Sequence, residues 1–255
     1  MFQITIDPLI EYLQSMPPEL VVIFSILCCY SSIIFVTKFL QKEGLYIYSV
    51  IAIVASNMQA LKAMEIGWYD KPIALGTLVY ATTFLTSDVL TELYGAKAAR
   101  KSIALGFAGS ITLLLLMTFA LGLKPLNIDT GSEHQHFNDA HKALSVIFSP
   151  NGAILIASLT AYILSQLADI FIFSKLKKYT HNSYLWLRTF CSVSIASLVD
   201  TVIFSVLAWV VFAPEPISWD TLIFSYILGA YLLQMLIGLF NIPTFYLLLK
   251  IVKRA

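Results

Sequence analysis

The stretch that decides the fold is Ser102–Leu123, which reads SIALGFAGSITLLLLMTFALGL. Its 22 residues contain no charged side chain. About 20 residues of α-helix, at ~1.5 Å each, cross the ~30 Å hydrocarbon core of a membrane. Backbone N–H and C=O groups find no water there, so only a structure that bonds them internally can cross. We therefore predict a membrane-spanning helix over residues 102–123.

Six other stretches have a similar length and apolar character. They cover residues 20–40, 45–61, 72–92, 152–173, 188–212 and 220–249. None shows the alternation of apolar and polar residues that is typical of a membrane β-barrel strand. The predicted fold class is therefore all-α, a polytopic membrane helix bundle of seven transmembrane helices.

The composition of the whole chain excludes other classes of protein. Apolar residues make up 58% of the chain and charged residues only 12%, whereas about 25% of residues in soluble domains are charged. The net charge of +1 excludes a strongly basic nucleic-acid binder. Cys28, Cys29 and Cys191 lie in apolar stretches, so we expect them to be packing residues. Residues 1–19 contain no Lys or Arg, which argues against a secretory signal.

The lysines and arginines indicate an orientation. With seven crossings, 12 of these residues fall on one side and 4 on the other. The larger group comprises Lys38, Lys42, Lys97, Arg100, Lys101, Lys175, Lys177, Lys178, Arg188, Lys250, Lys253 and Arg254. Because cytoplasmic loops accumulate Lys and Arg, we predict a multi-pass protein of the cell (inner) membrane with its N-terminus outside and its C-terminus in the cytoplasm. The longest connection, residues 124–150, would face outward.

Three carboxylates, Asp88, Asp169 and Asp200, lie within or at the edge of apolar stretches. Each costs roughly 2.5–3.5 kcal/mol at the centre of a membrane helix, so such residues usually serve a function, although interfacial or purely structural positions are the alternative. At ~1.5 Å per residue, Asp200 lies about 18 Å from Arg188, near the membrane centre, and Gln234 is similarly central in the last stretch. These two residues are the best candidates for the floor of a cavity, while Asp88 and Asp169 fall in the cytoplasmic third.

Helical spacing places further polar residues beside these acids. Asp88 and Glu92 are four residues apart, and Gln166 precedes Asp169 by three, so each pair shares one helix face. Arg188 begins the stretch that follows Asp169, across a short cytoplasmic connection. An ion pair between Arg188 and Asp169 would account for both residues without a ligand, and this alternative stays open beside a binding role.

One group of residues in the outward connection has the composition of a metal site. It consists of Glu133, His134, His136, Asp139 and His141. Its spacing fits no zinc pattern, so we predict no metal and no cofactor. The sequence also lacks a phosphate-binding glycine loop, a nucleophile elbow and the His-Glu pair of a zinc hydrolase. We therefore do not expect an enzyme.

Three blocks of sequence resemble the queuosine precursor transporter family. They are TSDVLTELYG at Thr86–Gly95, SQLADIFIF at Ser165–Phe173 and SLVDT at Ser197–Thr201. Ser56-Asn57 is similar to a further family position, and the resemblance runs over residues 49–253. Because many relatives have six helices, it implies that residues 1–44 form a leader and an additional transmembrane helix, and that residues 45–255 form a six-helix transporter core.

The resemblance implies a membrane transporter that imports 7-deazaguanine compounds for tRNA modification: 7-cyano-7-deazaguanine, 7-aminomethyl-7-deazaguanine or queuine. The substrate-binding candidates that it implies, joined by the central Gln234, are Asn57, Asp88, Glu92, Gln166, Asp169, Arg188 and Asp200. Aromatic side chains available for stacking are Tyr80, Phe84, Phe173, Phe204 and Tyr231. The expected partners are this small molecule and the lipid bilayer, with no nucleic acid, and a homo-oligomer stays open. Two alternatives remain: the substrate-binding subunit of an ATP-driven vitamin-type importer, and an intramembrane hydrolase that uses the buried acids.

Overall fold

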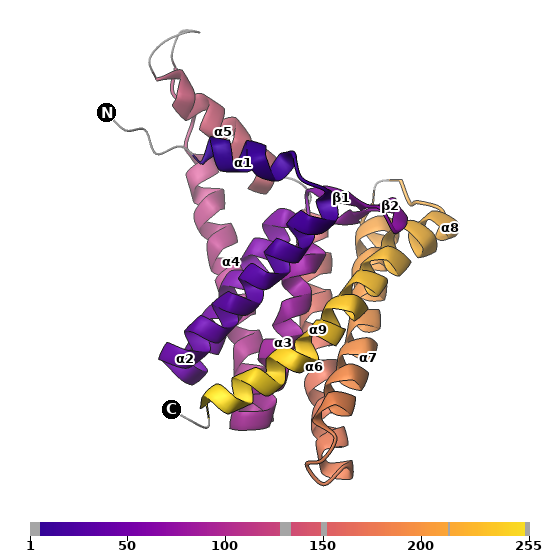
Figure 1. Cartoon of the computed structure of the whole chain (residues 1–255). Coiled ribbons are helices and arrows are strands. Elements are labelled where there is room, and N and C mark those ends of the chain that lie inside the picture. The colour runs from indigo at the N-terminus through magenta and orange to yellow at the C-terminus, as the bar shows by residue number, and fades with distance from the viewer. Residues whose placement is uncertain (1–5, 128–133, 149–151, 214, 253–255) are drawn as a thin grey trace.

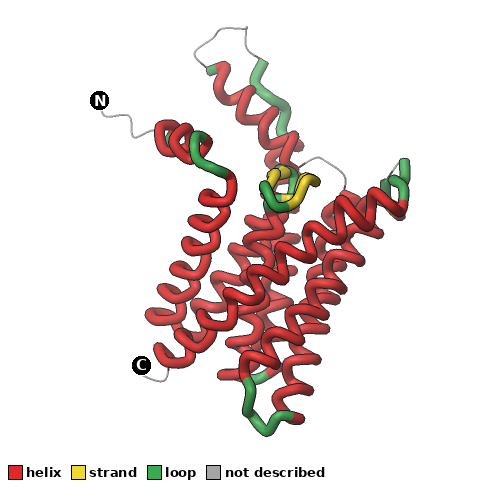
Figure 2. Tube along the Cα trace, turned by 45° about the vertical axis from the view of Figure 1, so that its right-hand side comes forward, coloured by secondary structure: helices red, strands yellow, loops and turns green. Residues whose placement is uncertain are grey.

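The computed structural model describes residues 6–127, 134–148, 152–213 and 215–252, and most of them are helical. Five helices are long and apolar enough to cross a membrane. They are Pro18–Gln59, Ala96–Gly122, Ile154–Tyr179, Leu185–Val211 and Trp219–Val252. Figures 1 and 2 show that the helices pack into one bundle. The predicted all-α membrane bundle is confirmed.

Helix α2 (Pro18–Gln59) is broken at Gln41, whose φ of 48° and ψ of −121° are not helical. Gly44 allows the close approach at this turn, because a Cβ there would lie 2.2 Å from a backbone oxygen of the preceding helical turns. The Glu19 carboxylate, near the start of α2, accepts a 2.8 Å hydrogen bond from the N–H of Gly67, which lies beyond its end. The two halves of α2 therefore run in opposite directions and match the first two predicted stretches (Figure 1).

A β-hairpin, which the sequence interpretation missed, follows α2. Strands β1 (Ala63–Ile66) and β2 (Tyr69–Ala74) are antiparallel. The third apolar stretch was predicted to be helical from residue 72, but its helix α3 covers Gly76–Tyr94. Residues 72–74 belong to β2 instead, where Ile73 and Ala74 pair with Met64 and Ala63 of β1.

The remaining elements include helices in the four other predicted stretches and two helices outside those stretches, which were not predicted. All these helices are α1 (Asp7–Gln14), α4 (Ala96–Gly122), α5 (Gln135–Phe148), α6 (Gly152–Tyr179), α7 (Leu185–Val206), α8 (Trp219–Thr221) and α9 (Leu228–Val252). Two π-helical segments, η1 (Leu207–Val211) and η2 (Leu222–Ile227), continue α7 and precede α9. Helix α5 lies in the long connection that was predicted to be outward-facing, and it has no fully buried residue.

Helix α3 forms the centre of the bundle. Every residue from Leu78 to Thr91 is buried, and α3 packs against α2, α4, α6 and α9. These neighbours shield α3 from lipid, so it can carry Thr, Ser and Asp side chains that would be costly in contact with hydrocarbon. The most polar of the long helices is therefore also the most enclosed.

The two ends of the bundle differ chemically. At one end the ammonium groups of Lys42 and Lys101 both lie 5.7 Å from the centre of the Tyr46 ring, and Lys177 pairs with Glu92. We term this end, where lysines of three helices meet, the basic end. The opposite end carries β1 and β2 and is termed the hairpin end (Figure 1).

Candidate functional site

A cavity of about 440 Å³ lies between α2, α3, α6, α7 and α9, toward the hairpin end. It is termed the central cavity. Its lining residues are Ser56, Asn57, Ala60, Ala74, Gly76, Thr77, Tyr80, Ser158, Ala161, Asp200, Phe204 and Gln234. Three of the predicted binding residues, Asn57, Asp200 and Gln234, thus share one cavity.

The Asp200 carboxylate is the polar centre of this cavity. One of its oxygens accepts a 3.0 Å hydrogen bond from Gln234 Nε2, and the other accepts a 3.5 Å bond from Ser165 Oγ. The Ser165 hydroxyl lies 2.6 Å from the Tyr80 hydroxyl. Gln234 Oε1 is buried without a hydrogen-bond partner among the described residues. A ligand in the cavity therefore meets a carboxylate and, beside it, an amide group with an unused acceptor.

Small residues bring the helices that carry Asp200 and Gln234 together. Gly238 lies one turn after Gln234 on α9, and a Cβ there would come within 2.9 Å of Val193 Cγ1 on α7. Ala157 and Ala161 are buried on α6, which packs along α7. Small side chains permit such close approach between membrane helices. Small residues on α6 and α9 therefore set the close spacing of the helices around the cavity.

Two of the five aromatic candidates, Tyr80 and Phe204, line the central cavity. Phe84 packs edge-on against Tyr80, with 5.4 Å between the ring centres. The Arg188 guanidinium lies over the Phe173 ring, with 5.3 Å between the Arg188 Cζ atom and the ring centre. Tyr231 is not among the lining residues. Tyr80 and Phe204 are therefore the rings that the structure offers to a ligand in this cavity.

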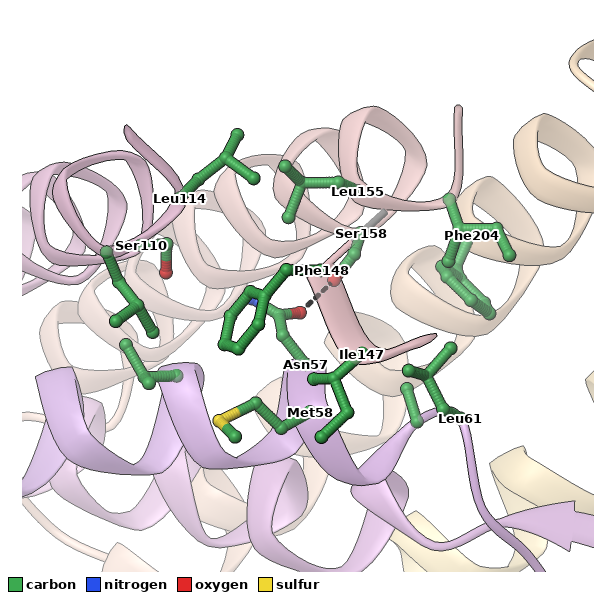
Figure 3. Close-up of a pocket in the computed structure, with 14 residues that line it drawn as sticks. Asn57, Met58, Leu61, Ser110, Leu114, Ile147, Phe148, Leu155, Ser158 and Phe204 are labelled. Atoms are coloured by element: carbon green, nitrogen blue, oxygen red, sulfur yellow. Dashed lines mark hydrogen bonds between the residues drawn. The ribbon is translucent and has the colours of Figure 1, made fainter. Parts of the chain in front are cut away.

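A second cavity, of about 690 Å³, adjoins the first and is termed the outer pocket. The two share Asn57, Ala60, Ser158 and Phe204. Figure 3 shows the Asn57 amide meeting the Ser158 hydroxyl, which donates a short hydrogen bond to it, with Ile147 and Phe148 of α5 nearby. Sequence reasoning missed this pocket and the role of α5 in its wall. The apolar cluster at the end of α5 was the available signal.

Asp88 and Asp169 form a separate group nearer the basic end, termed the acid pair. Both are fully buried, on α3 and α6. Ser192 of α7 donates a 3.5 Å hydrogen bond to Asp88, and neither oxygen of Asp169 has a hydrogen-bond partner among the described residues. Neither carboxylate lines the central cavity or the outer pocket. The predicted binding residues therefore occupy two places along the bundle axis.

The alternative ion pair between Arg188 and Asp169 is wrong for this structure. Arg188 is 1% exposed and its Nη2 lies 3.2 Å from Glu92 Oε2. Lys177 lies 3.1 Å from the same oxygen. Among the residues the structure describes, Asp169 has no ion pair. Arg188 instead packs on Phe173 and reaches the carboxylate at the end of α3.

Gln166 lies between the residues of the central cavity and the acid pair. Its Nε2 donates a 2.8 Å hydrogen bond to Thr83 Oγ1 on α3. Gln166 and Ser87 line a small void of about 190 Å³ between α2, α3, α4 and α6. Along α3, Thr77, Tyr80, Thr83 and Ser87 follow one another at helical intervals of three, three and four residues. A polar face of α3 therefore leads from the central cavity to the acid pair.

The histidine group of the outward connection lies partly outside the described residues, because Glu133 is not among them. His136 and Phe137 lie with their ring centres 4.0 Å apart. Over the described part of the chain, no group of three or more His, Cys, Asp or Glu residues is arranged to hold a metal ion.

Comparison with known proteins identifies relatives of this chain. A protein of Bacillus subtilis (strain 168), described as "Probable queuosine precursor transporter", is 30% identical over 212 residues, which are 83% of this chain and 86% of that protein. A Haemophilus influenzae protein (strain ATCC 51907 / DSM 11121 / KW20 / Rd) with the same description is 25% identical over 182 residues, 70% of this chain and 69% of that protein. No solved structure matches the chain.

A family match covers most of the cavity walls. Residues 74–248 match the family described as "Putative vitamin uptake transporter". This range includes Asp88, Asp169, Asp200 and Gln234, whereas Asn57 lies before it. Since the match extends over more than half of the sequence, the chain belongs to this family of vitamin uptake transporters.

Proposed function

We propose that this protein imports queuosine precursors, 7-deazaguanine compounds such as 7-cyano-7-deazaguanine, 7-aminomethyl-7-deazaguanine or queuine, into the cytoplasm for tRNA modification. The family and the descriptions of the two relatives support transport of such compounds. The observation that carries the proposal is the pairing of Asp200 with Gln234 in a cavity that Tyr80 and Phe204 also line.

The chemistry of a deazaguanine ring suits these side chains. Its guanine-like edge presents a ring N–H and an exocyclic amine, and one carboxylate can accept hydrogen bonds from both. The Asp200 carboxylate is the proposed acceptor. The unpartnered Gln234 Oε1 adds a second acceptor close by. The rings of Tyr80 and Phe204 supply apolar faces on which a flat heterocycle stacks.

In the proposed topology the chain crosses the membrane seven times. The two halves of α2 count as two crossings, because they run in opposite directions. The others are α3, α4, α6, α7 with η1, and η2 with α9. Concentration of Lys at the basic end supports placing that end in the cytoplasm and the hairpin end outside. Residues 1–44 then supply one additional helix to a six-helix core of residues 45–255.

The proposed transport route enters from the outer side. The central cavity adjoins the outer pocket, whose wall includes α5 of the outward connection. At the basic end, Glu92 of α3 joins Lys177 of α6 and Arg188 of α7. We infer that this three-helix ion cluster closes the cytoplasmic side while the cavity is accessible from outside, and opens in the alternate state.

The test is uptake by cells that cannot synthesise queuosine and that express this protein. Each of the three compounds is offered in labelled form, alone or with an excess of either of the other two, and modified tRNA is assayed afterwards. We expect uptake above that of cells with an empty vector, with competition by at least one unlabelled compound. Guanine, offered in the same excess, is the control for general purine transport. Uptake equal to that of the empty vector for all three compounds would contradict the proposal.

A further inference from the structure

The acid pair, Asp88 and Asp169, lies apart from the proposed substrate site. We propose that this pair binds one monovalent cation, a proton or a sodium ion, and that movement of this ion drives substrate import. The inference rests on the proposed function and adds its energy source. It separates the predicted binding residues into a substrate group at Asp200 and Gln234 and an ion group at Asp88 and Asp169.

The first argument is the balance of charge around the acid pair. The charged side chains there that face the acid pair, or are paired beside it, come from three helices: Asp88 and Glu92 of α3, Asp169 and Lys177 of α6, and Arg188 of α7. Three carboxylates and two cations leave one negative charge. An uncompensated charge at this depth is costly, so a single monovalent cation would complete the group.

The second argument is the pairing within this group. Both cations, Lys177 and Arg188, contact Glu92, and Arg188 also attracts Asp88 electrostatically. Among the described residues, Arg188 is the only cationic side chain that is fully buried, so no other cation is available inside the bundle. Asp88 and Asp169 interact with each other electrostatically, and like charges repel when both are ionised. A shared proton or a sodium ion between them removes this repulsion.

The third argument is the set of oxygen atoms around the pair. Ser192 donates to Asp88 at 3.5 Å. The hydroxyls of Ser87 and Thr189 interact with Asp169 and Asp88 respectively. Ser87 is 4% exposed and Thr189 is 0% exposed, and neither hydroxyl has a well-formed hydrogen bond among the described residues. Carboxylate and hydroxyl oxygens are hard donors of the kind that small inorganic cations prefer.

The two groups are mechanically connected through α6. Ser165 contacts Tyr80 and Asp200 at the central cavity, and Asp169 follows it by one helical turn. Gln166, between them in sequence, holds Thr83 of α3. A shift of α6 that accompanies ion binding would therefore move a contact of the substrate site. Such a shift is the physical basis for coupling, because each ligand then alters the affinity for the other.

The experiment uses the purified full-length protein in liposomes. Labelled 7-cyano-7-deazaguanine, 7-aminomethyl-7-deazaguanine or queuine is supplied outside, with an inward gradient of protons in one arm and of sodium in a second arm. A third arm has neither gradient and contains unlabelled substrate inside, so that it measures exchange alone. For one ion per substrate, a tenfold ion gradient sustains up to about tenfold accumulation. We expect accumulation in the proton arm or the sodium arm, and exchange in the third.

The informative variants are Asp169→Asn and Asp88→Asn, with Asp220→Asn of the exposed helix α8 as the matched control. The two acid-pair variants should bind and exchange substrate but lose accumulation, whereas Asp220→Asn should behave as the wild type. Ser192→Ala, a milder change, should reduce accumulation without abolishing exchange. Thermal unfolding in detergent gives a readout free of transport. Added sodium or lower pH should stabilise the wild type more than it stabilises either acid-pair variant.

The outcomes separate this inference from the proposed function. If the wild type exchanges substrate but neither gradient drives accumulation, the ion site is refuted and the substrate site stands. Accumulation retained by both acid-pair variants would also refute it. If the wild type neither binds nor exchanges any of the three compounds, the proposed function fails and the inference fails with it.

Discussion

Gln234 and Asp200, 34 residues apart in sequence, meet across a 3.0 Å hydrogen bond between α9 and α7. Each side chain lies near the middle of its candidate membrane span, Leu185–Val211 or Trp219–Val252, where a polar group has few alternatives to a protein partner. The amide uses its donor on the carboxylate and keeps its oxygen without a partner among the described residues. This asymmetry leaves the site rich in acceptors, which suits a ligand edge that is rich in donors.

We predict that Asp200→Asn lowers queuine uptake at least about tenfold, because an amide replaces one acceptor by a donor and removes the charge that strengthens the hydrogen bonds. Membrane insertion should be unaffected, since the two side chains are nearly the same size. Uptake is measured against the amount of protein in the membrane. Asp220→Asn is the control, and normal uptake by a correctly inserted Asp200→Asn protein would exclude this residue from the substrate site.

Asn57 and Ser158 share a hydrogen bond on the wall between the two cavities, so their variants distinguish a substrate contact from a structural one. We expect Asn57→Ala to raise the substrate concentration for half-maximal uptake about fivefold to tenfold, because the amide can bond the substrate directly. Ser158→Ala should change it less than twofold, since the Asn57 amide would be freed for the ligand. Equal effects of the two variants on the half-maximal concentration would indicate that uptake depends on the hydrogen bond between Asn57 and Ser158 rather than on a contact of Asn57 with the substrate.

Glu92→Gln should loosen the basic end, because it removes the carboxylate that Arg188 and Lys177 share. Removing one partner of a buried ion pair costs about 3–5 kcal/mol. The native Cys191, three residues after Arg188 and half-buried, reports on this opening in a Cys28→Ser, Cys29→Ser background. We expect faster alkylation of Cys191 and a lower melting temperature. Glu65→Gln, on the exposed part of β1, should alter neither.

Gly44→Ala should destabilise the protein strongly, since its Cβ would lie 2.2 Å from the Val36 carbonyl oxygen and that backbone atom cannot rotate away. The matched control is Gly122→Ala at the end of α4, where nothing lies within 4 Å of the added Cβ. Alanine there should be neutral, or stabilising by at most about 1 kcal/mol through its helix propensity. Thermal unfolding in detergent compares the two, and similar melting temperatures would contradict the close contact seen at the turn of α2.

The depth of a residue could be predicted from the sequence because it depends only on the helical rise. Asp200 and Gln234 were expected to share a level and they do share a cavity, while Asp88 and Asp169 were expected nearer the cytoplasm. The partner of Arg188 could not be predicted in this way. It depends on how each helix is rotated about its axis, and that rotation is set by packing between elements far apart in sequence.

Other local features could be predicted only in part. The turn at Gln41 falls in the gap between the predicted stretches 20–40 and 45–61, whereas the close approach of Gly44 to the preceding helical turns could not be predicted. The hairpin of β1 and β2 is too short for its alternation to stand out against the apolar stretches on both sides. The outer pocket depends on α5, whose position follows from tertiary packing rather than from its own sequence.

The π-helical segments η1 and η2 affect how sequence changes would act at the hairpin end. A π-bulge accommodates one additional residue in a helix. This additional residue turns the faces of all residues beyond the bulge by about 100° about the helix axis, relative to an unbroken α-helix. Both segments lie on the hairpin side of the residues that carry the central cavity. The direction in which Asp200 and Gln234 point is thus independent of how the helical turns beyond η1 and η2 are rotated about their axes. Deleting one residue within Leu207–Val211 should convert η1 to ordinary α-helix and leave Asp200 and Gln234 facing each other.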